Sequence, residues 1–355
     1  MTVGDTTHIE WTDATWSPVT GCTKVSEGCR HCYIERTPPF RMEGRKFRCP
    51  RCGGSGYVED SDGNRLAYGK SGQFIAGARC ARCSGTGRAG IGDTTGVRMH
   101  EDRLDVPLRW RKPRKVFVCS MADLFHEAVS SSFIASVFAV MALTPQHTYQ
   151  VLTKRPARMR ALLSSPDFHW RMWHSLLTAS HAAMLPIPPS VTAHFHGGAR
   201  LGERHMTPLP NVWLGVTVED QKATWRLDDL EATPAAVRWV SCEPTLSEIG
   251  LSPWLGRGAL DWVVAGGESG PGARPMHPDW ARSLRDQCAA AGVPYLFKQW
   301  GDLVTEEQAP EDITLPAVSW RYLGDDQPPV WRVGKKRAGR LLDGAQHDGY
   351  PGGEA

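Results

Sequence analysis

The chain has 355 residues, of which 41% are hydrophobic and 22% charged, and its formal net charge is +3. This composition excludes wholesale disorder and a fibrous repeat, and the length suits one large α/β barrel with insertions. The charge is too small to indicate nucleic-acid binding by itself, because such proteins are marked by local basic clusters.

The N-terminus lacks the basic start and apolar stretch of a secretory signal, and the longest apolar run, 133–143, is too short to span a bilayer. We therefore expect a cytoplasmic protein with no membrane anchor. In a reducing compartment, clustered cysteines indicate metal ligands rather than disulfides. Three of the ten cysteines are scattered and are expected to be small buried hydrophobes: Cys119, Cys242 and Cys288.

The N-terminal segment, 1–33, contains three closely spaced cysteines, Cys22, Cys29 and Cys32, and no fourth cysteine nearby. A structural zinc ion needs four ligands, so His31 or a remote group would have to complete such a site. An iron-sulfur cluster held by three cysteines instead keeps one iron open, and such clusters serve radical chemistry together with S-adenosylmethionine (SAM). The spacing leaves both interpretations open.

Residues 34–98 form a small inserted module that is rich in Gly, Arg and Cys. Two copies of the pattern C-x2-C-x-G-x-G place Cys49, Cys52, Cys80 and Cys83 in the spacing of paired zinc knuckles. The module resembles the zinc module of DnaJ-type chaperones. We expect a closed structural zinc site, with a role in holding substrate as the secondary hypothesis.

Residues 99–305 alternate between short apolar runs and helical patterns, the order expected of βα units around a parallel sheet. An insertion, 164–210, interrupts them as a lid or flanking element, and 306–355 form a C-terminal extension. The predicted strands begin at residues 115, 148, 211, 237, 261 and 294. The predicted helices lie in 131–143, 155–163, 221–232 and 277–292.

Nearly every predicted strand ends in polar or charged groups. In a barrel these ends converge on the face where active sites are built, although strands that simply exit into water would show the same pattern at any one position. The candidate cofactor-binding residues are Ser120, Asp123, Lys154, Glu219, Glu243, Gly266, Gly267 and Glu268. Lys298 and Gln299 follow the last strand and are the candidate catalytic residues.

Two basic runs, 109–115 and 334–340, have Trp110 and Trp331 beside them. Basic residues interleaved with aromatics suit phosphate contacts and base stacking. Each run alone is equally consistent with a solvated surface.

Long motifs along the chain resemble a family of phage- and prophage-encoded proteins of unknown function: HIEWTDATWSPVTGC, PLRWRKPRKVFVCSMADLFHE, PQHTYQVLTKRPARM, NVWLGVTVED, SCEPTL, WVVAGGESGPGARP and YLFKQWG. The resemblance implies a partial TIM-type (βα) barrel of the radical-SAM kind, distantly similar to spore photoproduct lyase. It implies a [4Fe-4S] cluster on Cys22, Cys29 and Cys32 whose open iron binds SAM. Reductive cleavage would then give a 5′-deoxyadenosyl radical, with an electron donor such as a flavodoxin or ferredoxin.

Three functions follow as hypotheses. The first is a radical-SAM enzyme that modifies or repairs DNA or RNA, and the second is a radical-SAM enzyme that acts on a peptide or small metabolite. The third is a zinc-dependent adaptor of phage origin whose barrel has no catalytic activity.

Overall fold

The computed structural model describes Thr7, 9–32, Ile34, 97–197, 204–311, 313–315 and 328–352, together with five short strands within 46–90. The chain divides into two compact units. The larger unit comprises 1–20, 24–31 and 98–355, and the smaller comprises 21–23 and 32–97. The four cysteines of the expected zinc site lie outside the described residues.

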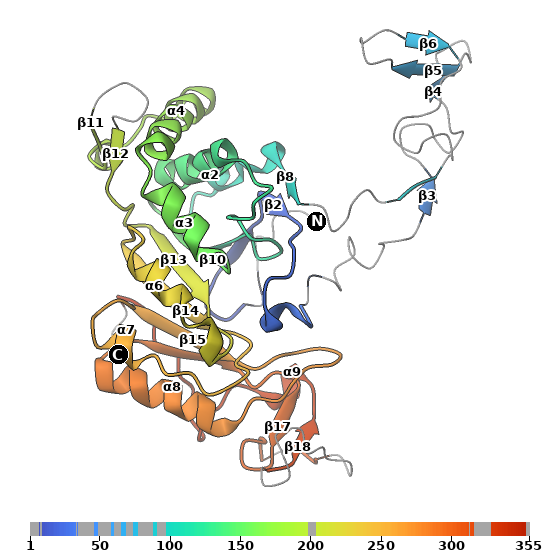
Figure 1. Cartoon of the computed structure of the whole chain (residues 1–355), viewed down its shortest axis with the longest axis vertical. Helices are drawn as coiled ribbons and strands as arrows, with labels where there is room; N and C mark the ends of the chain where they lie inside the picture. Colours follow the sequence, from blue (N-terminus) through green and yellow to red (C-terminus); the bar gives the residue numbers. More distant parts are fainter. Residues whose placement is uncertain are drawn as a thin grey trace. The chain divides into compact units, whose positions relative to one another are not determined.

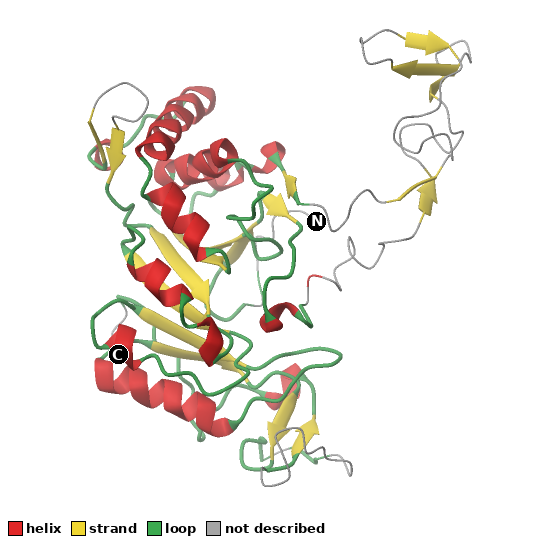
Figure 2. Ribbon diagram, viewed as in Figure 1, coloured by secondary structure: helices red, strands yellow, loops and turns green. Residues whose placement is uncertain are grey.

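A curled parallel sheet of seven strands, a half-barrel, forms the core of the larger unit (Figures 1 and 2). Its order is β1-β9-β10-β13-β14-β15-β16, so each strand pairs with the next sheet strand along the chain. The seven strands are β1 (Ala14–Trp16), β9 (Lys115–Val118), β10 (Thr148–Thr153), β13 (Val212–Thr217), β14 (Val237–Cys242), β15 (Trp262–Gly266) and β16 (Tyr295–Gln299).

The six predicted strands are confirmed, each beginning at the predicted residue or one residue later. Sequence reasoning missed β1, which has three residues and no apolar run. It pairs with β9 through Ala14 opposite Val116. The expected α/β class is thus correct, and the observed form is a half-barrel.

Helices connect the strands and confirm the four predicted helical patterns. Ser130 begins the first long helix by accepting a hydrogen bond from the Phe133 amide, as an N-cap does. The α-helices are α2 (Ser131–Leu143), α3 (Pro156–Leu163), α4 (Pro166–Ala183), α5 (Pro189–Thr192), α6 (Arg226–Glu231), α7 (Ser252–Leu255), α8 (Pro278–Ala291) and α9 (Lys335–Ala338). The 3-10 helices are η1 (Glu27–Cys29), η3 (Glu101–Arg103), η4 (Val106–Arg109) and η5 (Gln221–Ala223). Among the described helices, none is long and apolar enough to cross a membrane.

The main helix of the 164–210 stretch packs on α2. This helix, α4, places Phe168 edge-on against Phe138 at 6.0 Å, and Ser136 donates a hydrogen bond to Ser175. The insertion continues through α5 into the hairpin of β11 (Phe195–Gly197) and β12 (Arg204–Met206).

One face of the sheet carries an aromatic cluster at the amino ends of the strands. Its core consists of Trp11, Phe117, Trp213, Trp239, Trp262, Val264 and Leu296. Trp11 comes from the segment before β1 and contacts Trp239 and Trp262 at 5.2 and 6.1 Å. This cluster fills one end of the half-barrel's interior, which leaves the carboxyl edge of the sheet for polar groups.

The C-terminal segment covers the outer edge of β16. The Phe297 amide donates to the His347 carbonyl, and the Gly349 amide donates to the Tyr295 carbonyl, both at 2.9 Å. Tyr350 then packs against Trp213 and Trp262, with ring centroids 4.9 Å away in each case. The edge of the sheet is therefore protected from pairing with another chain.

The remaining described strands form small separate sheets. In the larger unit, β2 (Val19–Thr20) pairs with β8 (Arg98–Met99), and β17 (Leu303–Thr305) pairs with β18 (Val330–Arg332). In the smaller unit, two sheets comprise β3 (Lys46–Arg48) with β7 (Arg88–Gly90), and β4 (Val58–Glu59), β5 (Arg65–Tyr68) and β6 (Phe74–Ala76).

Candidate functional site at the carboxyl edge of the sheet

Residues 24–31, hereafter the Cys29 segment, lie against the carboxyl edge of the half-barrel. The Ser26 hydroxyl donates a hydrogen bond to Glu219, which follows β13. Arg274, in the loop after β15, donates to the Glu27 carbonyl at 3.1 Å. The segment therefore extends from the end of β13 to the loop that follows β15.

The three cysteines of the predicted cluster do not all belong to the same unit. Cys29 is part of the larger unit, whereas Cys22 and Cys32 belong to the smaller one. All three are half-buried. Within the part of the chain that the structure describes, no three His, Cys, Asp or Glu side chains are gathered as a metal-binding group. The thiols offer ligand chemistry that suits an iron-sulfur cluster or zinc.

Glu219 and Glu268 are buried and already ion-paired. Arg226 reaches Glu219 at 2.6 Å, and Arg274 reaches Glu268 at 2.7 Å. Burial acts to raise the pKa of Glu219, but Lys154, Arg226 and the Ser26 hydrogen bond outweigh it, so the pKa lies below its usual value. For Glu268 burial is likewise outweighed, mainly by the hydrogen bonds from Arg274, and the pKa is lowered. Both carboxylates are thus ionised at neutral pH.

Asp123 is also fully engaged within the protein. Its carboxylate accepts hydrogen bonds from the Thr153 hydroxyl at 2.7 Å and the Lys154 amide at 3.0 Å, and it pairs with Arg155 at 3.1 Å. These contacts join the loop after β9 to the end of β10. Ser120 lies half-buried in the same loop, directly after Cys119, whose positive φ of 59° turns the chain sharply.

The structure brings together two predicted residues from either side of β15: Glu243, which follows β14, and Lys298, which lies in β16. Their side chains form an ion pair at 3.0 Å and are 15% and 17% exposed. Because side chains alternate along a strand, Glu243 and Ser241 share the face of Trp239, and Lys298 shares the face of Leu296. The pair therefore occupies the interior of the half-barrel on the carboxyl side of the aromatic cluster.

Close packing requires glycine at Gly266 and Gly267, the first two residues of the sequence GGES at 266–269. A Cβ on Gly266 would lie 2.8 Å from Glu243 Oε1, and a Cβ on Gly267 would overlap the Trp300 carbonyl. The register of β15 and β16 also shifts between Ala265 and Gly266. Gln299 is buried and donates to the Gly267 carbonyl at 3.2 Å. These contacts make the end of β15 compact.

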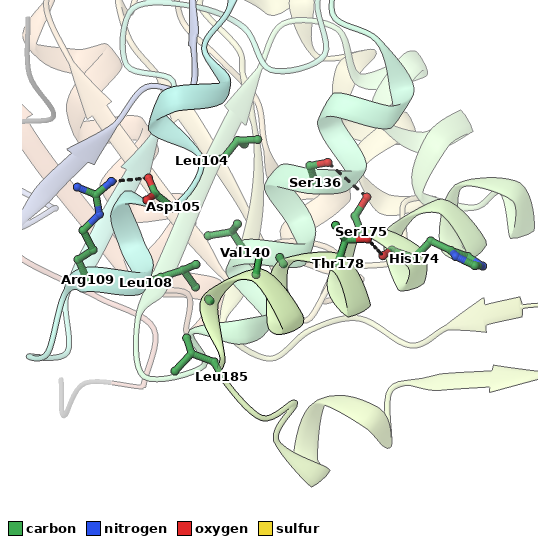
Figure 3. Close-up of a pocket in the computed structure, with 13 residues that line it drawn as sticks. Leu104, Asp105, Leu108, Arg109, Ser136, Val140, His174, Ser175, Thr178 and Leu185 are labelled. Atoms are coloured by element: carbon green, nitrogen blue, oxygen red, sulfur yellow. Dashed lines mark hydrogen bonds and ion pairs between the residues drawn. The ribbon is translucent and has the colours of Figure 1, made fainter.

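A separate cavity of about 660 Å³ lies between η4, α2 and α4 (Figure 3). None of the predicted site residues lines it. Its walls are largely apolar, and Asp105 pairs with Arg109 at 2.5 Å near Leu104 and Leu108. Its volume is large enough for a small ligand. No cysteine is among the residues that line it.

Sequence reasoning missed four residues that shape the site: Ser26, Gly28, Arg226 and Arg274. A Cβ on Gly28 would lie 2.8 Å from Glu219 Oε1, so the backbone of the Cys29 segment approaches that carboxylate closely at Gly28. Arg274 stands within a quoted motif, GARP, but no local pattern predicts a contact with a residue 247 positions away. The long-range pairings became visible only with the fold.

A family model described as "Protein of unknown function (DUF5131)" matches residues 6–351. The chain belongs to this family. The match includes both insertions, and no curated protein and no solved structure matches the chain.

This finding corrects the family assignment drawn from the motifs. The resemblance to a phage-encoded, radical-SAM-like family related to spore photoproduct lyase is wrong, because the family that matches is one of unknown function without a radical-SAM description. A function therefore has to be argued from the chemistry of the site.

Proposed function

We propose that this chain is an iron-sulfur enzyme that uses SAM to modify or repair a nucleic acid. The observation that carries the proposal is the position of the Cys29 segment at the carboxyl edge of a parallel half-barrel, where enzymes of barrel type build their sites. A barrel of the radical-SAM kind is part of this proposal.

The ligands would be Cys22, Cys29 and Cys32. Three thiolates satisfy three irons of a [4Fe-4S] cluster and leave the fourth open, which suits a set of three cysteines. When bound, the cluster would supply the electron that cleaves SAM to a 5′-deoxyadenosyl radical. A flavodoxin or ferredoxin is the proposed source of that electron.

The interior of the half-barrel offers groups for orienting bound molecules. The Glu243 carboxylate suits an ammonium group and the Lys298 ammonium a carboxylate, so a zwitterionic ligand would exchange their mutual pairing for two new ones. Ser120 and Lys154 are half-buried beside the same edge. The aromatic cluster closes the amino side of this interior and would exclude water from that direction.

The nucleic-acid part of the proposal draws on exposed basic residues of the larger unit. Lys335, Lys336 and Arg337 lie in α9, and Lys335 forms an ion pair with Glu10 at 3.7 Å. Lys336 and Arg337 are exposed. Side chains of this kind make the salt-sensitive phosphate contacts that dominate nucleic-acid affinity.

The deciding experiment is anaerobic reconstitution of the full chain with iron and sulfide. We expect a coloured protein with bound iron and sulfide that releases 5′-deoxyadenosine from SAM under reduction. Cys29→Ala should lose the colour, whereas Cys288→Ala, which changes a buried cysteine of α8, should keep it. A colourless wild-type protein would contradict the proposal and favour the adaptor hypothesis.

The substrate class is tested by binding of the reconstituted protein to DNA and RNA oligonucleotides at increasing salt. Affinity should fall steeply between about 50 and about 200 mM salt, because phosphate contacts release counterions. An affinity that does not change with salt concentration, or no binding, would favour a peptide or small metabolite as substrate.

A further inference from the structure

Two relays of hydrogen bonds connect the Cys29 segment to the sheet. In the first, Arg226 donates to Glu219 at 2.6 Å and to the Thr217 carbonyl at 2.7 Å, and Glu219 accepts from Ser26. In the second, Glu268 accepts two hydrogen bonds from the Arg274 guanidinium, at 2.9 and 2.7 Å, and Arg274 also donates to the Glu27 carbonyl. Each relay runs from a strand end, through one carboxylate and one arginine, to the segment.

The inner members of both relays are buried. The Glu219 and Arg226 side chains are 1% and 4% exposed, and the Glu268 side chain is 7% exposed. Removing one partner of such a pair leaves a buried charge without compensation, so breaking either pair is costly. Each of the two carboxylates already has an arginine partner within the protein.

The first relay ends next to the cysteine itself. The Ser26 hydroxyl oxygen lies 3.8 Å from Cys29 Sγ. A hydroxyl has one proton, and Ser26 gives it to Glu219, so the Cys29 thiol is the donor in the contact with Ser26. The thiol is thereby restrained through the same serine that anchors the segment.

We propose that Glu219 and Glu268 are positioning residues that fasten the Cys29 segment to the carboxyl edge of the sheet, rather than groups that bind a cofactor. The role in cluster assembly rests on the proposed function, but the anchoring of Cys29 does not. Cofactor or substrate contacts then fall to the Glu243–Lys298 pair, which faces the interior and has no contact with the segment among the interactions recorded for it.

The test uses the full chain without metal and measures how fast Cys29 is alkylated by iodoacetamide, with mass spectrometry to locate the modified residue. Ser26→Ala removes the anchor and leaves the buried Glu219–Arg226 pair intact. We expect alkylation of Cys29 on the order of tenfold faster than in the wild type, since a hydrogen bond to a charged group is lost. Ser26→Thr keeps the hydroxyl and should restore the slow rate, and Arg274→Ala tests the second relay in the same assay.

Glu248→Gln is the matched control, because Glu248 is an exposed carboxylate in the loop after β14 with no recorded ion pair. It should alkylate at the wild-type rate. A wild-type rate in folded Ser26→Ala would overturn the proposal, as would failure of Ser26→Thr to restore protection.

Reconstitution separates this inference from the proposed function. If the wild type binds no cluster but Ser26→Ala exposes Cys29, the enzyme proposal fails and the anchoring stands. If the wild type binds a cluster and Ser26→Ala has the same alkylation rate and the same electron paramagnetic resonance signal after reduction, the anchoring role fails.

Discussion

Gly215 in the middle of β13 is required by its neighbour Trp239 on β14. A Cβ at this position would lie 2.5 Å from the indole nitrogen of Trp239, which is fully buried. The ring fills the space that a side chain would otherwise occupy. The glycine is thus part of the aromatic cluster, because it lets the largest side chain of the next strand cross the sheet surface.

Gly215→Ala should therefore destabilise the protein by about 1–3 kcal/mol, the usual cost of overpacking a core. Urea unfolding followed by tryptophan fluorescence measures the change. Gly250→Ala is the control, since a Cβ there would come no closer than 3.7 Å to Gln221. Equal stability of the two variants would contradict the packing argument.

Single residues also show how far the sequence predicts the site. Glu219 and Glu268 were identified from their places after apolar strands, and they do lie at the carboxyl edge. Their partners Arg226 and Arg274 were not identified, because an ion pair depends on how loops meet and not on local spacing. Glu243 and Lys298 were both predicted, and only the register of the sheet reveals that they pair.

At the level of elements, the C-terminal segment completes the half-barrel. Tyr350 contacts two tryptophans of the aromatic cluster, Gln150 donates to its hydroxyl at 3.0 Å, and the Lys115 ammonium lies 3.6 Å from its ring centroid. No periodic pattern in 306–355 predicted this contact, because the segment is irregular and gains its structure from the surface that it covers.

Tyr350→Ala should destabilise the protein by about 3 kcal/mol, the lower end for loss of a large aromatic side chain, since Tyr350 is half-buried. Tyr350→Phe keeps the ring and loses only the hydrogen bond from Gln150, a cost of about 1 kcal/mol. Thermal or urea unfolding of the two variants gives the comparison. A similar loss of stability in both variants would show that the hydroxyl, and not the packing of the ring, causes the effect.

For the whole molecule, we expect three buried or half-buried histidines to contribute to the response to mild acid. Burial lowers the pKa of His100, His126 and His147, and positive neighbours such as Arg155 beside His126 lower it further. His126 Nδ1 accepts a hydrogen bond from the Ala128 amide, which requires the neutral ring. The folded state therefore binds fewer protons than the unfolded state below the ordinary histidine pKa of about 6.5.

Because the unfolded state takes up more protons, the free energy of unfolding should fall as the pH drops below about 6.5. The carboxylates with lowered pKa values stabilise the fold down to a more acidic pH. Between about pH 7.5 and about pH 5.5, the change in the free energy of unfolding therefore comes from the histidines. His126→Asn retains an acceptor for Ala128 and cannot titrate, and its stability should fall less over this range. An identical fall in the variant would exclude His126 as a source.

The pairing of β1 with β9 has a consequence for the order of folding. Asp13 and Lys115 are joined across 102 residues, whereas the other sheet strands pair with partners much nearer along the chain. Closing a long loop costs more entropy than closing a short one, and non-local contacts form late. We expect β9 to β16 to assemble first and the N-terminal strand, with Trp11 ahead of it, to dock last. The aromatic interior would then be sealed in the final step of folding by the residues that come first in the sequence.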